Sequence, residues 1–197
     1  MNVTELLKKK LEKTVTRQQA EEAIKVLLAW AGDNPKREGL LDTPKRVIKA
    51  FEEYFSGYLI DPYKDLEKTF GDVEGYDDIV IQKNISIYSH CEHHMAPIIG
   101  VAHVAYVPHE KIVGLSKLAR VVEAYSRRLQ TQERLTMEIA NTIFKGLKAQ
   151  GAAVSIDAVH HCMTSRGIKK HEATTVTNYF TGVFKESHNL QNRFLHY

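Results

Sequence analysis

The chain has 197 residues, 43% of them hydrophobic and 26% charged, a balance that is typical of one globular domain and excludes a disordered or coiled-coil protein. Its formal net charge of +3 is too small for a bulk nucleic-acid binder, so we expect no nucleic-acid partner. No stretch offers the ~20 apolar residues of a spanning helix, and the N-terminus lacks the apolar region of a secretory signal, so we expect no membrane partner, a cytoplasmic location and reduced thiols.

The first third of the chain is expected to be helical. Apolar residues from Thr16 to Gly32 recur at the three- and four-residue spacing of an amphipathic helix, with Thr16 as the N-cap and Gly32 as the stop. Trp30 lies in this helix and is expected in the core. A capping residue followed by Pro44 predicts a second helix, from Pro44 to about Phe55, because proline favours the first helical position.

In the rest of the chain the spacing of apolar residues changes, and the pattern predicts a compact α+β core. β-branched residues indicate strands, and amphipathic runs that follow them indicate helices. The expected order is strands over 79–81 with 85–88 and over 98–107 as an antiparallel pair, helices over 114–129 and 132–147, strands over 152–163 and 173–184, and a short tail. We therefore predict an N-terminal helical segment, residues 1–75, and a β-β-α-α-β-β core, residues 76–197, in a single globular unit.

Histidine and cysteine gather in two places. Five of the ten histidines and both cysteines lie in the runs His90-Cys91-Glu92-His93-His94 and His160-His161-Cys162. Both residue types are common zinc ligands, and the spacing of Cys91 and His94 lets one tight turn bring them to one ion. On a strand that continues to Met163, His160 and Cys162 share a face, so Cys162 is the expected third ligand. Three protein ligands leave a fourth position for water, which is typical of a catalytic zinc site.

Other interpretations of these two runs stay open. His160 would stand beside the ion without binding it, and His161 would point away. The two cysteines could instead form a disulfide or be inert thiols, although a reducing compartment argues against the former and neither explains the histidines. A closed zinc finger is disfavoured because no second ligand pair completes it, and the deaminase pattern is absent.

Several cations are candidates for binding an anionic substrate. Ser116, Lys117 and Arg120 open a predicted helix whose N-terminal amides and dipole favour an anion. Arg166 follows the second cysteine by four residues, and the adjoining Gly167 permits close approach of the backbone. There is no Walker motif, which excludes a P-loop nucleotide site.

Three further charged residues are ambiguous from the sequence alone. Arg46 and Lys49 are neighbours on the second predicted helix and can face one anion, but a solvated basic face fits them equally well. Glu133, near the start of the helix over 132–147, is by itself better explained as a surface acid.

Four motifs stand in order along the chain. They are Ser89-His90-Cys91-Glu92-His93-His94, Gly114-Leu115-Ser116-Lys117-Leu118-Ala119-Arg120, Gln132-Glu133-Arg134-Leu135-Thr136, and the segment from Ser155 to Cys162 with Arg166-Gly167. Together they resemble GTP cyclohydrolase I of the zinc-containing type, from about residue 20 to the C-terminus. The resemblance implies the tunnelling fold (T-fold), a homodecamer of two face-to-face pentamers with active sites between subunits, and conversion of GTP and water to 7,8-dihydroneopterin triphosphate and formate, the first step of folate and pterin biosynthesis.

The resemblance also implies a role for each candidate residue. It gives a zinc ion held by Cys91, His94 and Cys162, proton transfer by His160 and His93 with help from Ser116, guanine recognition by Gln132 and Glu133, and a triphosphate clamp of Ser116, Lys117, Arg120, Arg166, Arg46 and Lys49. Thr131 and the segment 169–172 depart from the family pattern, but neither contributes a ligand.

Three rival hypotheses make different demands on the same residues. A non-catalytic pterin- or nucleotide-binding oligomer of this fold would keep the clamp and lose the metal ligands. A structural zinc protein that binds nucleic acid would need a closed metal site and a basic stripe. A nitrile-reducing or pyruvoyl-pterin enzyme of the same fold should lack the Cys-Glu-His-His run.

Overall fold

The computed structural model describes residues 15–70, 75–109 and 111–196. Two helices open the described chain: α2 (Arg17–Trp30) and α3 (Thr43–Tyr54). The predicted N-cap is confirmed, since the Thr16 hydroxyl accepts from the Gln19 amide and the Gln19 side chain accepts from the Thr16 amide. The second helix carries Pro44 in its first turn, as expected. The predictions for residues 1–14 and 71–74 lie outside the described residues.

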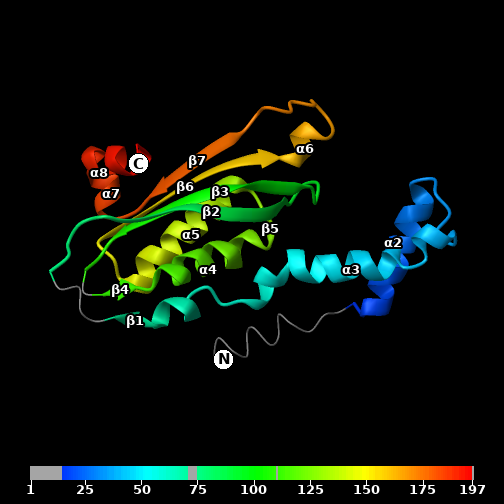
Figure 1. The fold of residues 1–197 in the computed structure, drawn as a ribbon, viewed down its shortest axis with the longest axis horizontal. Helices are drawn as coiled ribbons and strands as arrows, with labels where there is room; N and C mark the ends of the chain where they lie inside the picture. The colour runs from blue at the N-terminus through cyan, green and yellow to red at the C-terminus, as the bar shows by residue number, and fades with distance from the viewer. Residues whose placement is uncertain (1–14, 71–74, 110, 197) are drawn as a thin grey trace.

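The pair α2 and α3 projects beyond the end of the sheet, with α2 farthest from it (Figure 1). None of the residues of α2 is buried, and its contacts are made chiefly with α3. The expectation that Trp30 lies in the core is wrong, because its side chain is 86% exposed. Among the described residues, nothing fully covers the apolar stripe that predicted a core-facing helix.

Three short 3-10 helices flank α3. η1 (Glu38–Leu40) lies between α2 and α3, and η2 (Ser56–Leu59) and η3 (Lys64–Glu67) lead the chain from α3 back to the core. At Gly57 in η2, a Cβ atom would collide with the carbonyl oxygen of Ala124, so only glycine permits this close approach. Strand β1 (Thr69–Phe70) then pairs with β4 (Ile112–Val113). The division at residue 75 stays a prediction.

A five-stranded sheet forms the core, in the order β5-β2-β3-β6-β7. Adjacent strands of the sheet pair antiparallel, except that β5 runs parallel to β2. The predicted antiparallel pair is confirmed, with a register shift near Asn84, whose φ is +58°. The strands are β2 (Val80–Cys91), β3 (Pro97–Val107), β5 (Leu129–Gln130), β6 (Gly151–His160) and β7 (Thr175–Phe180).

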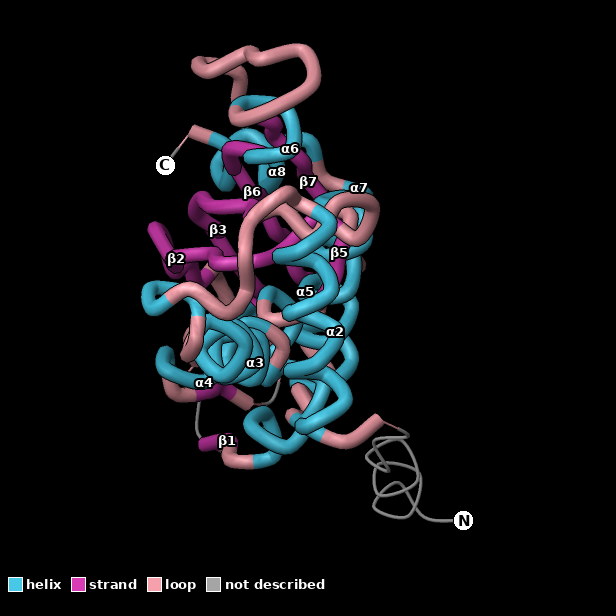
Figure 2. Tube along the Cα trace, turned by 90° about the vertical axis from the view of Figure 1, so that its right-hand side faces the viewer, coloured by secondary structure: helices cyan, strands magenta, loops and turns pink. Residues whose placement is uncertain are grey.

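Helices α4 (Leu115–Ser126) and α5 (Gln132–Leu147) cover one face of this sheet (Figures 1 and 2). Fully buried apolar side chains from both helices meet those of the strands, and this layer is the main core. The predicted β-β-α-α-β-β T-fold is confirmed. A smaller aromatic cluster, centred on Phe184 and Phe194, packs the tail helices α7 (Val183–Glu186) and α8 (His188–Leu195) against the sheet.

Three predicted boundaries are corrected. The helix expected over 114–129 ends at Ser126, and Leu129 lies in β5. Strand β6 ends at His160 rather than Met163, and a one-turn helix, α6 (His161–Thr164), follows it. The last strand spans only Thr175–Phe180, which is shorter than the predicted range 173–184. A search of the described helices finds none that is both long enough and apolar enough to cross a membrane.

Candidate metal and nucleotide site

A tight turn at the end of β2 brings the first two candidate ligands together. Cys91 is the last residue of the strand, and its carbonyl oxygen accepts from the amides of His94 and Met95 at 3.3 and 2.8 Å. Met95 completes the turn with a φ of +54°. His94 is thereby folded back, with its Nδ1 atom 3.7 Å from the Cys91 sulfur.

The one-turn helix α6 supplies the third candidate ligand. The ligand atoms of Cys91, His94 and Cys162 all lie within 4.8 Å of one another. The reasoning that placed Cys162 on a strand face beside His160 is wrong, because the strand has already ended. The expected grouping is nevertheless present, since a helical turn also brings Cys162 to the end of β2.

These three residues, which we call the metal cluster, have the chemistry of a metal site. Both cysteines are free thiols, and sulfur with imidazole nitrogen is a donor set that borderline-soft cations prefer. Burial raises the pKa of the Cys162 thiol, and the adjoining Cys91 thiol raises it further. A bound cation acts in the opposite direction, because it binds the thiolate. The three residues could therefore hold one metal ion and leave a position open.

His93 lies beside the cluster but differs from His94 in its surroundings. Its Nδ1 atom is 3.8 Å from the Cys91 sulfur, but its side chain is 66% exposed. Its Nε2 atom lies 3.8 Å from the Glu92 carboxylate. This position suits a group that exchanges protons with a ligand or with solvent.

The side chain of His160 is hydrogen-bonded to a buried glutamine, Gln132. The His160 Nε2 atom lies 2.7 Å from the side-chain oxygen of Gln132, which is only 1% exposed. The Gln132 amide nitrogen donates to the carbonyl oxygens of Ile156 and Thr175 at 3.1 and 2.8 Å, and to the Thr177 hydroxyl. Carbonyl oxygens only accept, so these contacts fix the orientation of the amide group.

The fixed amide also fixes the proton on His160. Because the Gln132 oxygen can only accept, the Nε2 atom of His160 must carry the hydrogen. In the neutral ring the Nδ1 atom is then the one with a free lone pair. The family resemblance implied that Gln132 binds guanine, whereas the structure places each polar atom of its side chain against protein.

Glu133, the neighbour of Gln132, has a different environment. It is exposed and lines a shallow groove between α5 and β7, together with Met137 and Tyr179. Burial lowers the pKa of His160, and the negative charge of Glu133 opposes that shift, which places the carboxylate near the histidine. Glu133 is thus available to a ligand beside His160.

One ion pair near the metal cluster was missed by sequence reasoning. The Arg134 guanidinium donates to the Glu92 carboxylate at 2.6 Å and to the Gln130 side-chain oxygen at 2.8 Å. Glu92 lies inside the turn between Cys91 and His94, so Arg134 ties this turn to α5. The pairing joins residues 42 positions apart, and no local spacing signals it.

Of the candidate cations, only Arg166 is brought to the metal cluster. Arg166 lies close enough to Cys162 to lower the pKa of that thiol, against the larger effect of burial. Gly167, with a φ of +62°, turns the chain immediately after it. The arginine is exposed and free to meet an anion above the cluster.

The other residues expected to bind the anion lie elsewhere in this chain. Helix α4 begins beside β4, at the opposite end of the sheet from α6 and the turn after β2 (Figure 1). Ser116 and Lys117 are therefore separated from the metal end by most of α4, roughly 15 Å of helix at ~1.5 Å per residue. Arg46 and Lys49 are on α3, where Arg46 lies 3.7 Å from Asp42. Among the described residues, no contact joins these four to the metal cluster.

Comparison with known proteins agrees with the resemblance. A sequence profile of the GTP cyclohydrolase I family matches residues 20–197. The GTP cyclohydrolase 1 of Pelagibacter ubique is 66% identical over 94% of this chain and 92% of its own length. Those of Maricaulis maris and Sinorhizobium fredii are 56% and 57% identical over 91% of this chain and 88% of their own lengths. The chain therefore belongs to the GTP cyclohydrolase I family.

Proposed function

We propose that this protein is a zinc-dependent GTP cyclohydrolase I, which opens the imidazole ring of GTP with water and rearranges the product to 7,8-dihydroneopterin triphosphate with release of formate. The observation that carries the proposal is the cluster of Cys91, His94 and Cys162 beside the His160–Gln132 pair, in a chain of this family. The product enters folate and pterin biosynthesis.

The donor set supports zinc as the metal. Two thiolates and one imidazole match the ligand types of catalytic zinc sites, which keep a fourth position open. When bound, the ion supplies Lewis acidity that activates water near neutral pH. Cys91, His94 and Cys162 are the proposed ligands, and the Arg134–Glu92 ion pair holds the turn that carries the first two.

The residues around the metal ligands act on the substrate. His160 moves a proton at the imidazole-ring nitrogen through its Nδ1 atom, and His93 serves as a second proton-transfer group. Glu133 accepts from the N1–H and 2-amino groups of guanine, which selects GTP over ATP. Gln132 holds His160 in one orientation, and this replaces the direct guanine contact expected for it. Arg166 binds a phosphate beside the metal.

The clamp residues that lie far from the metal ligands are proposed to act in a neighbouring subunit. Ser116, Lys117 and Arg120 complete the triphosphate clamp of a neighbouring chain, and Ser116 assists the later rearrangement there. The exposed apolar face of α2, with Leu27 57% and Trp30 86% exposed, supports assembly into a homo-oligomer, which we propose to be the decamer of two pentamers. Arg46 and Lys49 are proposed to reach a site in that assembly. The cytoplasmic location and the lack of nucleic-acid and membrane partners stay predictions.

The proposal is tested by incubating the purified protein with GTP, oxidising the product and measuring the fluorescent pterin together with formate and zinc per chain. We expect turnover of GTP but not of ATP, near one zinc per chain, and loss of activity with a chelator that zinc restores. A zinc-loaded oligomer that produces no pterin from GTP would overturn the proposal.

A further inference from the structure

Asp65 forms ion pairs with two cations of the proposed triphosphate clamp. Its Oδ1 atom accepts from the Lys117 ammonium at 3.2 Å and from the Arg120 guanidinium at 3.1 Å. Burial raises the pKa of the Asp65 carboxyl, but the hydrogen bonds from Arg120 and Lys117 outweigh it and leave the pKa below its usual value. An ionised carboxylate oxygen is thus shared by two residues that are 52 and 55 positions away in the sequence.

The backbone around Asp65 is anchored. Asp65 lies in η3, next to Leu66, which is 1% exposed and belongs to the main core. Leu66 packs so closely on α5 that a Cβ atom at Gly146 would lie 2.6 Å from its Cδ1 atom. Asp65 therefore cannot move far without pulling Leu66 out of the core, whereas lysine and arginine side chains can rotate away from it.

The shared oxygen lies where an oxygen of a polyphosphate would meet both cations. Charge-assisted bonds from Lys and Arg to phosphate use the same donors that Asp65 now occupies. When Lys117 and Arg120 turn to a triphosphate, two ion pairs break and a negative carboxylate stays close to the incoming anion. Both effects lower the affinity for the anion.

We propose that Asp65 is an internal counter-anion of the triphosphate clamp, which competes with the substrate for Lys117 and Arg120 and so sets the affinity and polyphosphate selectivity of the enzyme. This inference rests on the proposed function, which assigns the two cations to triphosphate. Asp65 is an affinity-determining residue in this role, and its carboxylate takes no part in the chemistry.

The test is Asp65→Asn, which removes the charge and preserves the shape. Partly exposed ion pairs contribute about 0.2–1 kcal/mol each, so breaking two in advance should lower KM for GTP roughly 2- to 30-fold. The inhibition constant of inorganic tripolyphosphate should fall by a similar factor, while binding of guanosine should stay unchanged. The gain should shrink as salt concentration rises. Damage to the fold would weaken binding, so tighter binding cannot arise from it.

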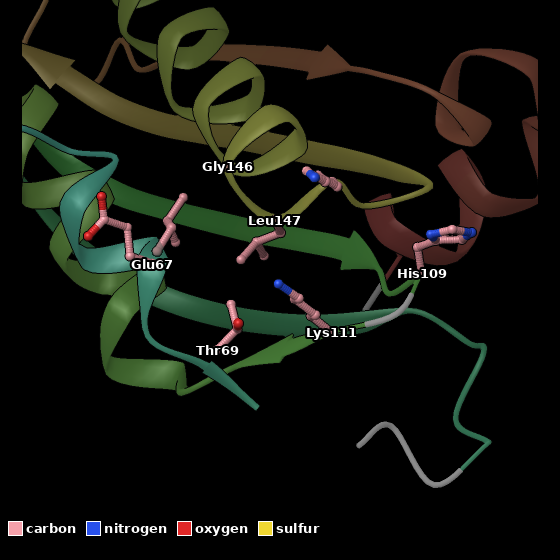
Figure 3. Close-up of a pocket in the computed structure, with 8 residues that line it drawn as sticks. Glu67, Thr69, His109, Lys111, Gly146 and Leu147 are labelled. Atoms are coloured by element: carbon pink, nitrogen blue, oxygen red, sulfur yellow. The ribbon is translucent and has the colours of Figure 1, made fainter. Parts of the chain in front are cut away.

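Glu67→Gln is the matched control, because it removes the same charge from the same short helix. Glu67 lines a small pocket with Lys111 and Leu147 (Figure 3), and it forms no ion pair among the described residues. This variant should keep KM for GTP within twofold of wild type. Asp65→Glu, which retains a carboxylate, should also stay closer to wild type than Asp65→Asn.

Two results would overturn the inference while wild-type enzyme still turns over GTP. One is an Asp65→Asn variant whose constants for GTP and tripolyphosphate match those of Glu67→Gln. The other is weaker binding of both anions, which would mean that the carboxylate holds the cations ready for substrate. Wild-type protein that does not turn over GTP would refute the proposed function instead, and calorimetric titration with tripolyphosphate would still decide the role of Asp65.

Discussion

Replacing Gln132 with leucine tests whether this buried amide positions the proposed proton-transfer group. The substitution keeps an apolar body of similar size and removes every polar contact of the side chain. The His160 ring loses its 2.7 Å partner, and the Thr175 carbonyl oxygen loses its 2.8 Å donor. Thr177 keeps its 2.7 Å contact with the Thr136 hydroxyl, so it is not left unpaired.

The expected magnitudes follow from these contacts. A buried polar group that loses its partner costs about 1–3 kcal/mol, so two such groups, offset by the apolar leucine, should lower the free energy of unfolding by about 2–4 kcal/mol per chain. An unheld His160 should reduce kcat roughly 10- to 100-fold, as is typical when the group that orients a functional histidine is removed. Zinc content should stay unchanged, since Gln132 touches none of the proposed ligands.

The assay combines kcat for pterin formation, zinc per chain and thermal unfolding at equal protein concentration. Thr142→Val is the control, because it breaks another buried contact of α5, the 2.7 Å hydrogen bond to the Tyr125 hydroxyl. It should lose stability and keep kcat within twofold. Folded, zinc-loaded Gln132→Leu enzyme with a kcat within threefold of wild type would refute the positioning role.

Four further predictions concern the metal, the nucleotide and the assembly. Cys162→Ser should lose zinc and activity in a folded oligomer, and atomic absorption that finds full zinc occupancy would contradict the ligand assignment. Glu133→Gln should reduce GTP turnover and keep tripolyphosphate affinity, because it sets an amide donor against the donors of guanine. Arg166→Ala should weaken the binding of GTP far more than the binding of guanosine, and equal losses for both ligands would exclude a phosphate contact. Trp30→Glu should dissociate the oligomer into smaller species in light scattering, and an unchanged mass would show that α2 lies outside the interface.

Features set by neighbouring residues were predictable from the sequence. The N-cap at Thr16, the proline start of α3 and the antiparallel β2–β3 pair depend on local hydrogen bonds and on the alternation of apolar residues. The spacing of Cys91 and His94 likewise fixes one turn, and a single turn suffices to bring both side chains together.

The end of β6 depended on its partner strand instead. β6 pairs with β3 as far as Ile98 and His160, and β3 itself begins at Pro97. A strand extends only while a neighbour offers backbone hydrogen bonds, so the chain leaves the sheet after His160 whatever the strand propensity of the next residues. The prediction that Cys162 joins Cys91 was therefore right in its outcome and wrong in its cause.

By itself, the sequence determined the T-fold order of elements, the turn that joins Cys91 to His94 and the family, because these follow from local periodicity and from motifs at fixed spacing. Only the tertiary structure decided that Gln132 faces His160, that Asp65 pairs with both Lys117 and Arg120, and that α4 begins at the opposite end of the sheet from α6 (Figure 1). Each of these relations joins residues far apart in the chain, and such contacts are set by how helices and strands pack, which no local pattern encodes.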